Sequence, residues 1–268
     1  MATTIAGSAT DRVHTNISDS GVAVLTLNNP PVNAADQHLY TAIKAAIEEA
    51  ELKARVIVLT GEGDRAFCGG NDLHEFVAMD GESAEHHMRV AREAFWALLD
   101  CRVPLIGAIN GPAIGTGFAL TACCDFVLAS ERATFAFPEI KAGVLGGMKF
   151  GARMLPEQAV RRMFFLGSAL TASEIKALGA PIEIVAHEDL LCAAVSLAEE
   201  IAQRSPLALQ LAKESMRVVE TLPLKQGYEA EQRYTIRLAT SPDSKEAVKA
   251  LLEHRPPKFQ ASTDRPRL

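Results

Sequence analysis

The spacing of apolar residues switches repeatedly between the two-residue period of a strand and the wider period of a helix. Residues 22–27 alternate as a strand does, and residues 37–52 repeat apolar side chains at helical spacing. Residues 56–60 form a continuous apolar run that ends at Gly61, which is typical of a buried strand. Because parallel strands need a crossover between them, this order predicts an α/β fold with mostly parallel strands.

The alternation continues to residue 185 and then stops. We expect a helix near residues 84–99 and further strands at residues 105–109, 126–129 and 182–185. Helical spacing then recurs four times, at residues 190–204, 207–220, 224–240 and 244–254. This pattern predicts an α/β core over residues 1–200 and a helical assembly region over residues 201–268.

Composition excludes several classes of protein. A chain of 268 residues, 48% hydrophobic and 22% charged, is long enough to bury a large core. Its net charge of −6 argues against nucleic acid as the main partner, and no apolar run is long enough for a membrane span. The polar start of the chain does not resemble a secretory signal. We therefore expect a cytoplasmic protein that binds neither nucleic acid nor a membrane.

Cysteine spacing predicts reduced, buried thiols. The chain has an odd number of cysteines, none in Cys-x-x-Cys spacing and most in apolar runs: Cys68, Cys101, Cys123, Cys124 and Cys192. No metal site is expected.

Two glycine-rich segments each follow an expected strand and precede a helix. They read FCGGNDL at residues 67–73 and GPAIGTGFALTACC at residues 111–124. A dinucleotide fingerprint would need glycine where Leu120 stands, and the Gly-Lys-Ser/Thr of a triphosphate loop is absent. Unpaired N–H groups at two helix starts could instead bind one oxygen, as an oxyanion hole does. The alternative is that the glycines only relieve crowding in the two turns.

Five segments, in order over residues 13–259, together resemble the crotonase, or enoyl-CoA hydratase/isomerase, superfamily. They are LTLNNPPVNA (25–34), AFCGGNDLHEF (66–76), PLIGAINGPAIGTGFALTACCD (104–125), ATFAFPEIKAGV (133–144) and HRPPKF (254–259). The resemblance implies a spiral of strand-strand-helix repeats with a C-terminal helical trimerisation region, assembled as a homotrimer or hexamer. It also implies an acyl-CoA thioester substrate, with coenzyme A as part of the substrate and no permanently bound cofactor.

The resemblance assigns roles by position. The backbone N–H groups of Asn71 and Thr116 would form the oxyanion hole, where the family usually has alanine and glycine. We expect the Thr116 hydroxyl to cap the following helix, the alternative being contact with the carbonyl region. Binding of substrate and coenzyme A falls to Ala34, Cys68, Gly69, Gly70, Asp72, Leu73, Gly115, Lys258 and Phe259.

One family glutamate is present and another is replaced. Glu139, at the end of FAFPE, matches the family's catalytic base, whereas Ala119 stands where hydratases carry a second glutamate. Addition of water normally uses two carboxylates, and transfer of a proton between two carbons needs one. We therefore expect an isomerase in which Glu139 removes the α-proton and returns it at the γ-carbon. Without the resemblance, Glu139 would be interpreted as a first-turn acid stabilised by a helix dipole.

Other reactions remain open. They are hydration, decarboxylation, carbon–carbon bond hydrolysis, and acyl-CoA binding without turnover. A second acid could come from a distant segment such as Tyr228 or Glu229. Lys149 and Phe150 stand where the family usually has two glycines, which predicts bulk in the path of the acyl chain or of water.

Residues near the first glycine segment have simpler expected roles. Asp72 is expected to cap the following helix, and Cys68 to pack beside the loop without acting as a nucleophile. A polar helix face accounts for the nearby histidines His74, His86 and His87.

The end of the chain is its one locally basic region, with six basic and three acidic residues from 245 to 268. In the family, this segment of one subunit closes over the nucleotide end of coenzyme A bound to its neighbour. We therefore expect Lys258 to bind the 3′-phosphate and Phe259 to pack on the adenine. The alternative is a solvated, frayed tail.

Overall fold

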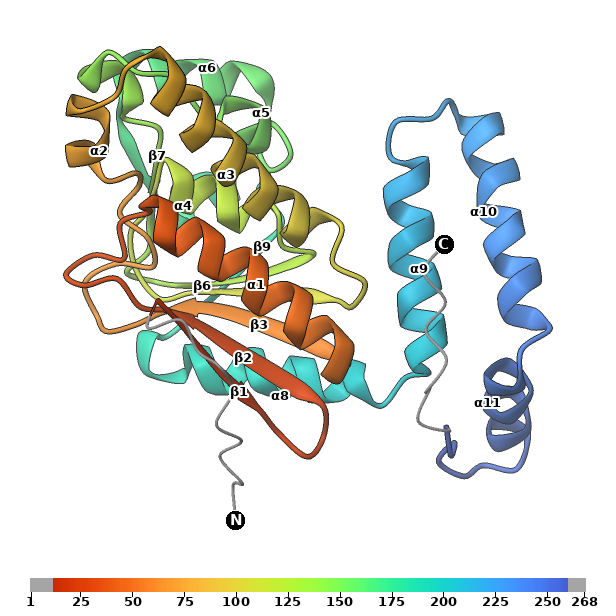
Figure 1. Cartoon of the computed structure of the whole chain (residues 1–268). Coiled ribbons are helices and arrows are strands. Elements are labelled where there is room, and N and C mark those ends of the chain that lie inside the picture. The colour runs from red at the N-terminus through yellow and green to blue at the C-terminus, as the bar shows by residue number, and fades with distance from the viewer. Residues whose placement is uncertain (1–11, 260–268) are drawn as a thin grey trace.

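A six-stranded sheet forms the centre of the fold in the computed structural model, which describes residues 12–259 (Figure 1). The strand order is β1-β2-β3-β4-β6-β9, antiparallel between β1 and β2 and parallel elsewhere. The strands are β1 (Val13–Ile17), β2 (Val22–Leu27), β3 (Val56–Gly61), β4 (Leu105–Ile109), β6 (Phe126–Ser130) and β9 (Ile182–Val185). The predicted α/β class and the five predicted strands are confirmed, and β1 is an addition.

A second, small sheet lies beside the glycine segments. Its three strands pair in the order β5-β7-β8, and they are β5 (Ala113–Ile114), β7 (Thr134–Ala136) and β8 (Ala169–Thr171). Strands of two or three residues are too short to show a periodicity, so sequence analysis missed them.

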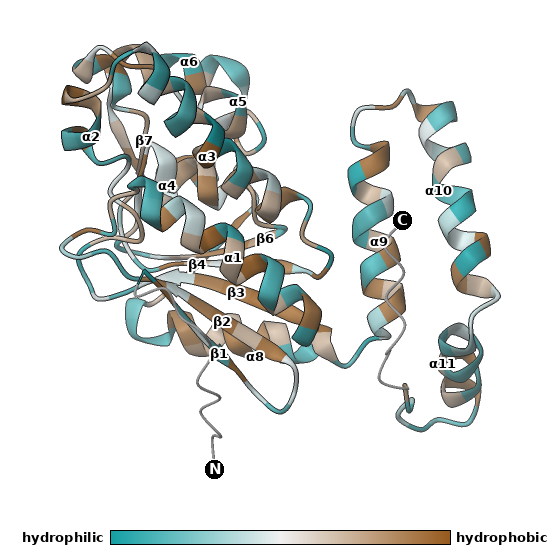
Figure 2. Ribbon diagram, in the orientation of Figure 1, coloured by the Kyte–Doolittle hydropathy of each residue, from teal (hydrophilic) through white to brown (hydrophobic). Residues whose placement is uncertain are grey.

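Helices cover both faces of the large sheet. α1 (Gln37–Lys53) and α3 (Gly81–Leu99) pack together on one face, and α8 (Leu190–Ala202) lies along the other (Figure 1). Successive side chains of β3 therefore enter two different apolar clusters, Ile57 on the α1 side and Val58 on the α8 side. Burial on both faces explains why β3 is a continuous apolar run, visible in Figure 2.

Short helices connect the remaining strands and carry the candidate site. They are α2 (Leu73–Val77), α4 (Thr116–Thr121), η1 (Glu139–Ala142), α5 (Met148–Gly151), α6 (Glu157–Leu166), α7 (Ala172–Ala177) and η2 (His187–Asp189).

The last three helices form an arm beside the core (Figure 1). They are α9 (Pro206–Val219), α10 (Leu224–Ala239) and α11 (Pro242–Leu252). Lys213 of α9 forms an ion pair with Asp125 of the core at 2.7 Å. The earlier helix α8 packs on the sheet, so the core continues to about residue 202. The arm coincides with the predicted assembly region, whose role in trimerisation stays a prediction.

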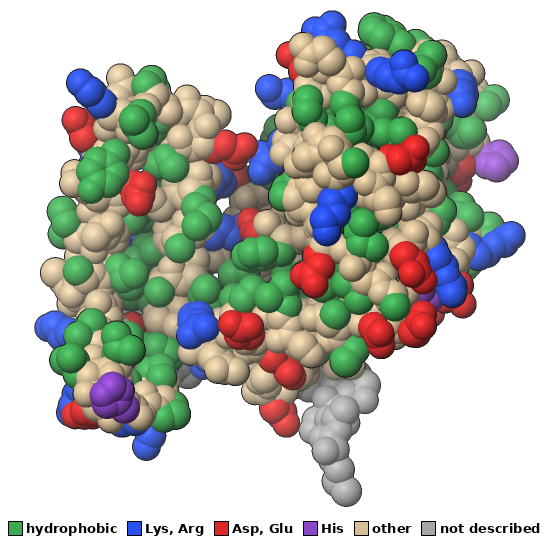
Figure 3. Space-filling view, turned by 180° about the vertical axis from the view of Figure 1, so that it is seen from behind, with side chains coloured by type: hydrophobic (Ala, Val, Ile, Leu, Met, Phe, Trp, Pro, Cys, Tyr) green, Lys and Arg blue, Asp and Glu red, His purple; other side chains and the backbone are tan. Residues whose placement is uncertain are grey.

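The arm exposes large apolar side chains, and Figure 3 shows hydrophobic groups gathered along it and on the core beside it. The exposed members are Met216, Val218, Leu222, Leu224, Tyr228, Ile236, Val248, Leu251 and Leu252. Groups of this kind often mark surfaces that contact another protein.

Four of the five cysteines are fully or partly buried. Cys68, Cys101 and Cys123 are buried as predicted, and Cys124 is partly buried. The prediction is wrong for Cys192, which is exposed. The helix α8 buries only one of its faces, which carries Leu190, Ala194, Ala198 and Ala202, and Cys192 lies off that face. Among the described helices, none combines 18 residues with the apolar character needed to cross a bilayer.

Candidate active site

The two glycine segments meet in space, which is the arrangement that the oxyanion-hole interpretation requires. The N–H of Ile114 donates to the carbonyl of Cys68 at 2.9 Å, and the N–H of Cys68 donates to the carbonyl of Pro112 at 3.2 Å. These bonds form a short parallel bridge between Cys68 and Ala113. The loop before α2 therefore runs directly beside the turn that opens α4.

Glycine is required where the two loops touch. A Cβ at Gly117 would collide with the backbone oxygen of Cys68, and one at Gly70 would lie 3.3 Å from the backbone oxygen of Ile114. Gly70 also has a φ of +98°, which side chains disfavour. The glycines relieve crowding at the place where the two loops converge. The two interpretations of the glycine segments are therefore compatible.

Two unpaired N–H groups lie at this junction. The residues on either side of Asn71 both bond to Ala35. The N–H of Ala35 donates to the carbonyl of Gly70 at 2.7 Å, and the N–H of Asp72 donates to the carbonyl of Ala35 at 3.0 Å. Thr116 is the first residue of α4, where N–H groups lack a helical acceptor. Within residues 12–259, the N–H groups of Asn71 and Thr116 donate to no other group.

The side chains of the same two residues meet a tyrosine. The Thr116 hydroxyl lies 2.8 Å from the Tyr40 hydroxyl and 3.1 Å from Asn71 Oδ1. The predicted capping role of Thr116 is therefore wrong, because Gly115 is the N-cap residue and Thr116 already belongs to the helix. Tyr40 was missed because it lies on the apolar face of α1, at a spacing that predicts only core packing.

Pairing of β5 with β7 brings Glu139 to the second glycine loop. The N–H of Gly115 donates to Ala136 at 2.8 Å, and the chain reaches η1 three residues later. The carboxylate then lies against the Cα of Gly115, so that a Cβ there would collide with Glu139 Oε1. Glu139 therefore adjoins the residue before Thr116.

The Glu139 carboxyl is poorly solvated. Its Oε2 atom is buried and has no hydrogen-bond partner among the described residues. Burial raises the pKa of Glu139 from its ordinary 4.5 to about 7, although a hydrogen bond from its own backbone opposes the shift. Since burial and not a neighbouring charge causes this shift, the group resembles the buried acids that enzymes use near neutral pH.

The helix beside Glu139 offers no second carboxyl at the family position. Ala119 is buried one turn into α4, where its N–H donates to Gly115 at 3.0 Å. The neighbouring Phe118 ring stacks on Phe137 at 4.9 Å between centroids. Ala119 therefore belongs to the same buried apolar cluster as Phe118 and Phe137 and carries no carboxyl.

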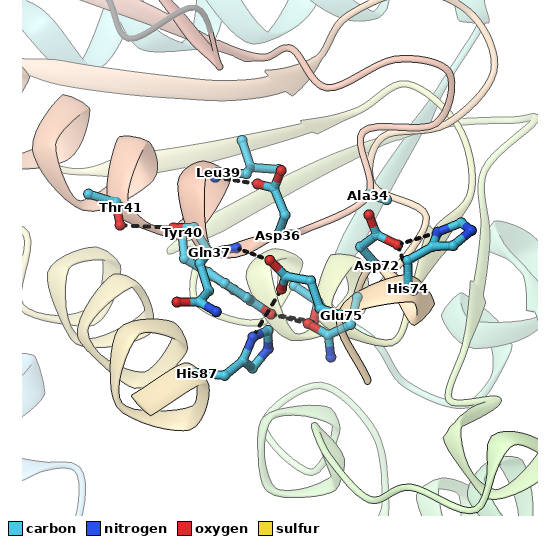
Figure 4. Close-up of polar contacts among 12 residues, drawn as sticks. Ala34, Asp36, Gln37, Leu39, Tyr40, Thr41, Asp72, His74, Glu75 and His87 are labelled. Carbon is cyan, nitrogen blue, oxygen red and sulfur yellow. Dashed lines mark hydrogen bonds and ion pairs between the residues drawn. The ribbon is translucent and has the colours of Figure 1, made fainter. Parts of the chain in front are cut away.

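Most of the other predicted binding residues lie on the first loop, where the N–H of Gly69 donates to the carbonyl of Val32 at 2.8 Å. Asp72 caps α2 by accepting from the N–H of His74 at 2.9 Å, as predicted, and this bond lowers the pKa of Asp72 (Figure 4). Cys68 is fully buried, and burial raises its thiol pKa to about 12, which agrees with the predicted packing role. The carbonyl of Ala34 accepts from Asn29 Nδ2 at 2.6 Å, and Leu73 opens α2 with an exposed side chain.

The prediction of a polar helix face is wrong for His87. His74 and His86 are exposed, whereas His87 is fully buried where α3 packs on α1. Its Nδ1 lies 3.1 Å from Glu75 Oε2 of α2 (Figure 4). Burial lowers the pKa of His87, and the Glu75 carboxylate opposes that shift. The sequence does hold a signal, because His87 precedes the buried Ala91 by four residues on one helix face.

Two predicted segments, those of Tyr228 and of Lys258, belong to the arm, and a third, that of Lys149, belongs to the short helix α5 that packs on α4. Tyr228 and Glu229 belong to α10, which lies beyond α9 from the core (Figure 1). Lys258 has an exposed side chain, and its N–H donates to Glu246 of α11 at 2.8 Å, with Phe259 next to it. Lys149 is exposed, whereas the Phe150 ring packs in a tilted arrangement against Phe95 of α3, at 4.7 Å between centroids.

Comparison with known proteins now identifies the family. Residues 18–262 match the family model described as enoyl-CoA hydratase/isomerase. The chain belongs to this family. It is 33% identical over 248 residues to the 2,3-dehydroadipyl-CoA hydratase of Escherichia coli, covering 89% of this chain and 95% of that protein.

Other members of the family are also similar. One is the (7aS)-7a-methyl-1,5-dioxo-2,3,5,6,7,7a-hexahydro-1H-indene-carboxyl-CoA hydrolase of Mycobacterium tuberculosis, 31% identical over 82% of this chain and 90% of that protein. The solved enoyl-CoA hydratase of Bacillus anthracis superposes with a TM-score of 0.87 at 27% identity, covering 92% of this chain and 98% of that structure. This enoyl-CoA hydratase/isomerase family member therefore has the crotonase fold and is an acyl-CoA enzyme.

Proposed function

We propose that this enzyme isomerises the double bond of an enoyl-CoA ester with Glu139 as its single acid–base group. The observation that carries the proposal is the partly buried Glu139 carboxyl, which has a pKa of about 7 and lies beside the glycine junction, with alanine at the other family position. The unpaired N–H groups of Asn71 and Thr116 are proposed to bind the thioester oxygen.

The proposed reaction needs one proton carrier. The ionised Glu139 removes a proton from the α-carbon of a 3-enoyl-CoA ester, and the electron pair moves toward the thioester oxygen. The two N–H groups stabilise the resulting dienolate. Protonated Glu139 then returns the proton to the γ-carbon, which leaves a 2-enoyl-CoA ester and the ionised carboxylate. A pKa of about 7 suits both steps, because neither protonation state of the group is strongly disfavoured near neutral pH.

A panel of 2-enoyl and 3-enoyl-CoA esters of graded chain length tests this proposal. We expect 3-enoyl esters to be converted to 2-enoyl esters, with slow hydration of the 2-enoyl esters. Ala119→Glu is expected to raise hydration by supplying the second carboxylate. Rapid hydration by the parent protein would show that alanine at position 119 does not prevent hydration.

Hydrolysis of a carbon–carbon bond is the second candidate, supported by the Mycobacterium tuberculosis relative that is named as a hydrolase of a dioxo-indene carboxyl-CoA ester. The same oxyanion site could stabilise the anion that forms in such a cleavage. Consumption of a cyclic diketone carboxyl-CoA ester, with no turnover of any enoyl ester, would favour this reaction over isomerisation.

Turnover should depend on pH through Glu139. The base acts in its ionised form, so kcat/KM for a 3-enoyl ester is expected to rise about tenfold per pH unit below pH 7 and to level off above it. Initial rates between pH 5 and 9 measure this profile. The residual activity of Glu139→Gln serves as the control, because its kcat/KM should not show the rise with pH below pH 7. A parent profile that is flat between pH 5 and 7 would count against the role of Glu139.

We also propose that the arm mediates trimer formation and that Lys258 binds the 3′-phosphate of coenzyme A at a neighbouring subunit. The support is the exposed apolar arm and the exposed Lys258 side chain at its end. Lys258→Glu is expected to weaken acyl-CoA binding, more strongly at low salt, with little change in kcat. Calorimetry with coenzyme A and 3′-dephospho-coenzyme A measures the effect. Equal affinities for both ligands in the parent protein would remove Lys258 from the site.

A further inference from the structure

We propose that the Tyr40 hydroxyl is a positioning group that fixes the two amide-bearing residues of the oxyanion hole against each other. The inference rests on the proposed function, since it takes the N–H groups of Asn71 and Thr116 as the oxygen-binding donors. Because Tyr40 is almost fully buried, we assign it no contact with the substrate, and its proposed effect is exerted through Asn71 and Thr116.

Three polar side chains from separate parts of the fold form a closed triangle. The Tyr40 hydroxyl of α1 donates to Asn71 Oδ1 at 2.5 Å and lies 2.8 Å from the Thr116 hydroxyl. The Thr116 hydroxyl lies 3.1 Å from the same Asn71 oxygen. Asn71 precedes α2 and Thr116 opens α4, so Tyr40 joins the two loops that carry the unpaired N–H groups.

The tyrosine ring is held in place by its neighbours. Tyr40 is 1% exposed, and its ring meets His87 edge-on at 5.8 Å and Phe95 at 6.1 Å between centroids. Burial raises the pKa of Tyr40, so its hydroxyl keeps its proton and remains a donor at neutral pH. A fixed ring with a protonated hydroxyl defines where Asn71 and Thr116 must lie.

The hydrogen-bond inventory of the triangle is complete at its oxygens. Tyr40 donates to the side-chain carbonyl of Asn71. The single proton of the Thr116 hydroxyl goes either to the Tyr40 oxygen or to the same side-chain carbonyl, which has two lone pairs and can accept from both hydroxyls. Buried networks of this kind hold one geometry, because any shift leaves a polar atom unpaired.

The side chains of Asn71 and Thr116 give the Tyr40 hydroxyl its role in this chain. Asn71 and Thr116 replace the alanine and glycine that are usual in the family, and neither of those has a polar side chain through which a third residue could act. An oxyanion hole depends on donors placed within a few tenths of an ångström of the developing charge. The polar replacements and Tyr40 thus form one unit.

Tyr40→Phe tests the proposal by removing only the hydroxyl. We expect kcat to fall about tenfold with KM little changed, a smaller loss than deletion of an oxyanion donor causes. The bound probe 4-(dimethylamino)cinnamoyl-CoA absorbs further to the red when its carbonyl accepts strong hydrogen bonds, and this red shift should shrink in Tyr40→Phe. Tyr234→Phe is the matched control, because Tyr234 of α10 bonds only to Glu214 among the described residues. It should change neither quantity.

A double-mutant cycle separates positioning from general stability. In the background Asn71→Ala with Thr116→Gly, the Tyr40 hydroxyl has nothing to hold, so Tyr40→Phe should cause no further loss of kcat or of red shift. An equal loss in both backgrounds would overturn the inference. Thr116→Ser, which keeps the hydroxyl, should retain the parent red shift, and Thr116→Val should reduce it as Tyr40→Phe does. This pair of variants tests the inference even if Tyr40→Phe does not fold.

The probe also distinguishes failure of this inference from failure of the proposed function. If the parent protein binds the probe without any red shift, the proposed oxyanion hole is wrong and the role of Tyr40 falls with it. If the parent gives the red shift and Tyr40→Phe keeps all of it, the oxyanion hole stands and only the role of Tyr40 is refuted.

Discussion

Replacing Glu139 by glutamine is expected to lower turnover by about two to four orders of magnitude, because a positioned acid–base group contributes on that scale. Glutamine keeps nearly the shape of the side chain that lies against Gly115, so acyl-CoA binding should change little. Single-turnover rates and the Kd of a substrate analogue measure the two effects separately. A variant that retains the full rate would refute the proposed base.

Stability provides the folding control for this variant. The pKa of Glu139 is about 7 in the folded chain against an ordinary value of 4.5, so the folded state holds the proton more tightly than the unfolded state. The free energy of unfolding of the parent therefore falls as pH rises from about 4.5 to 7. Glu139→Gln lacks this loss and should be at least as stable as the parent at pH 8, as urea denaturation would measure.

Apolar periodicity predicted the central sheet well because the burial of each of its segments is reflected in the order of apolar residues within that segment. Strand β3 is buried on both faces, and α1 buries one stripe of side chains, so each shows its structure in its local sequence. The strands β5 and β7 depend on each other and are too short for a pattern. They nevertheless bring Glu139 to the glycine loop, a juxtaposition that no local signal contains.

The candidate site was predicted in part for a similar reason. Glycine spacing identified both loops, and resemblance to the family singled out Glu139. Tyr40 was missed, and His87 was wrongly assigned to a polar helix face, because each occupies a core position on its helix. A buried hydroxyl or imidazole has the same spacing as an apolar residue, and only the folded chain shows which groups it meets.

Gly117→Ala is expected to damage both the site and the fold. The added methyl group would meet the backbone oxygen of Cys68, which already accepts from the N–H of Ile114 at 2.9 Å. Backbone atoms cannot move aside as the end of a flexible side chain can, so the two loops must separate. We expect a loss of about 1–3 kcal/mol in stability and, since a misplacement near 1 Å can cost that much, about 100-fold in turnover.

Gly81→Ala is the matched control for this substitution. Gly81 is the first residue of α3, has nothing within 4 Å of an added methyl group and lacks a positive φ, so alanine should be neutral or slightly stabilising there. Turnover and urea unfolding of both variants, measured beside the parent, make the comparison. If Gly117→Ala behaves like Gly81→Ala, close contact between the loops is not what holds the two N–H groups in place.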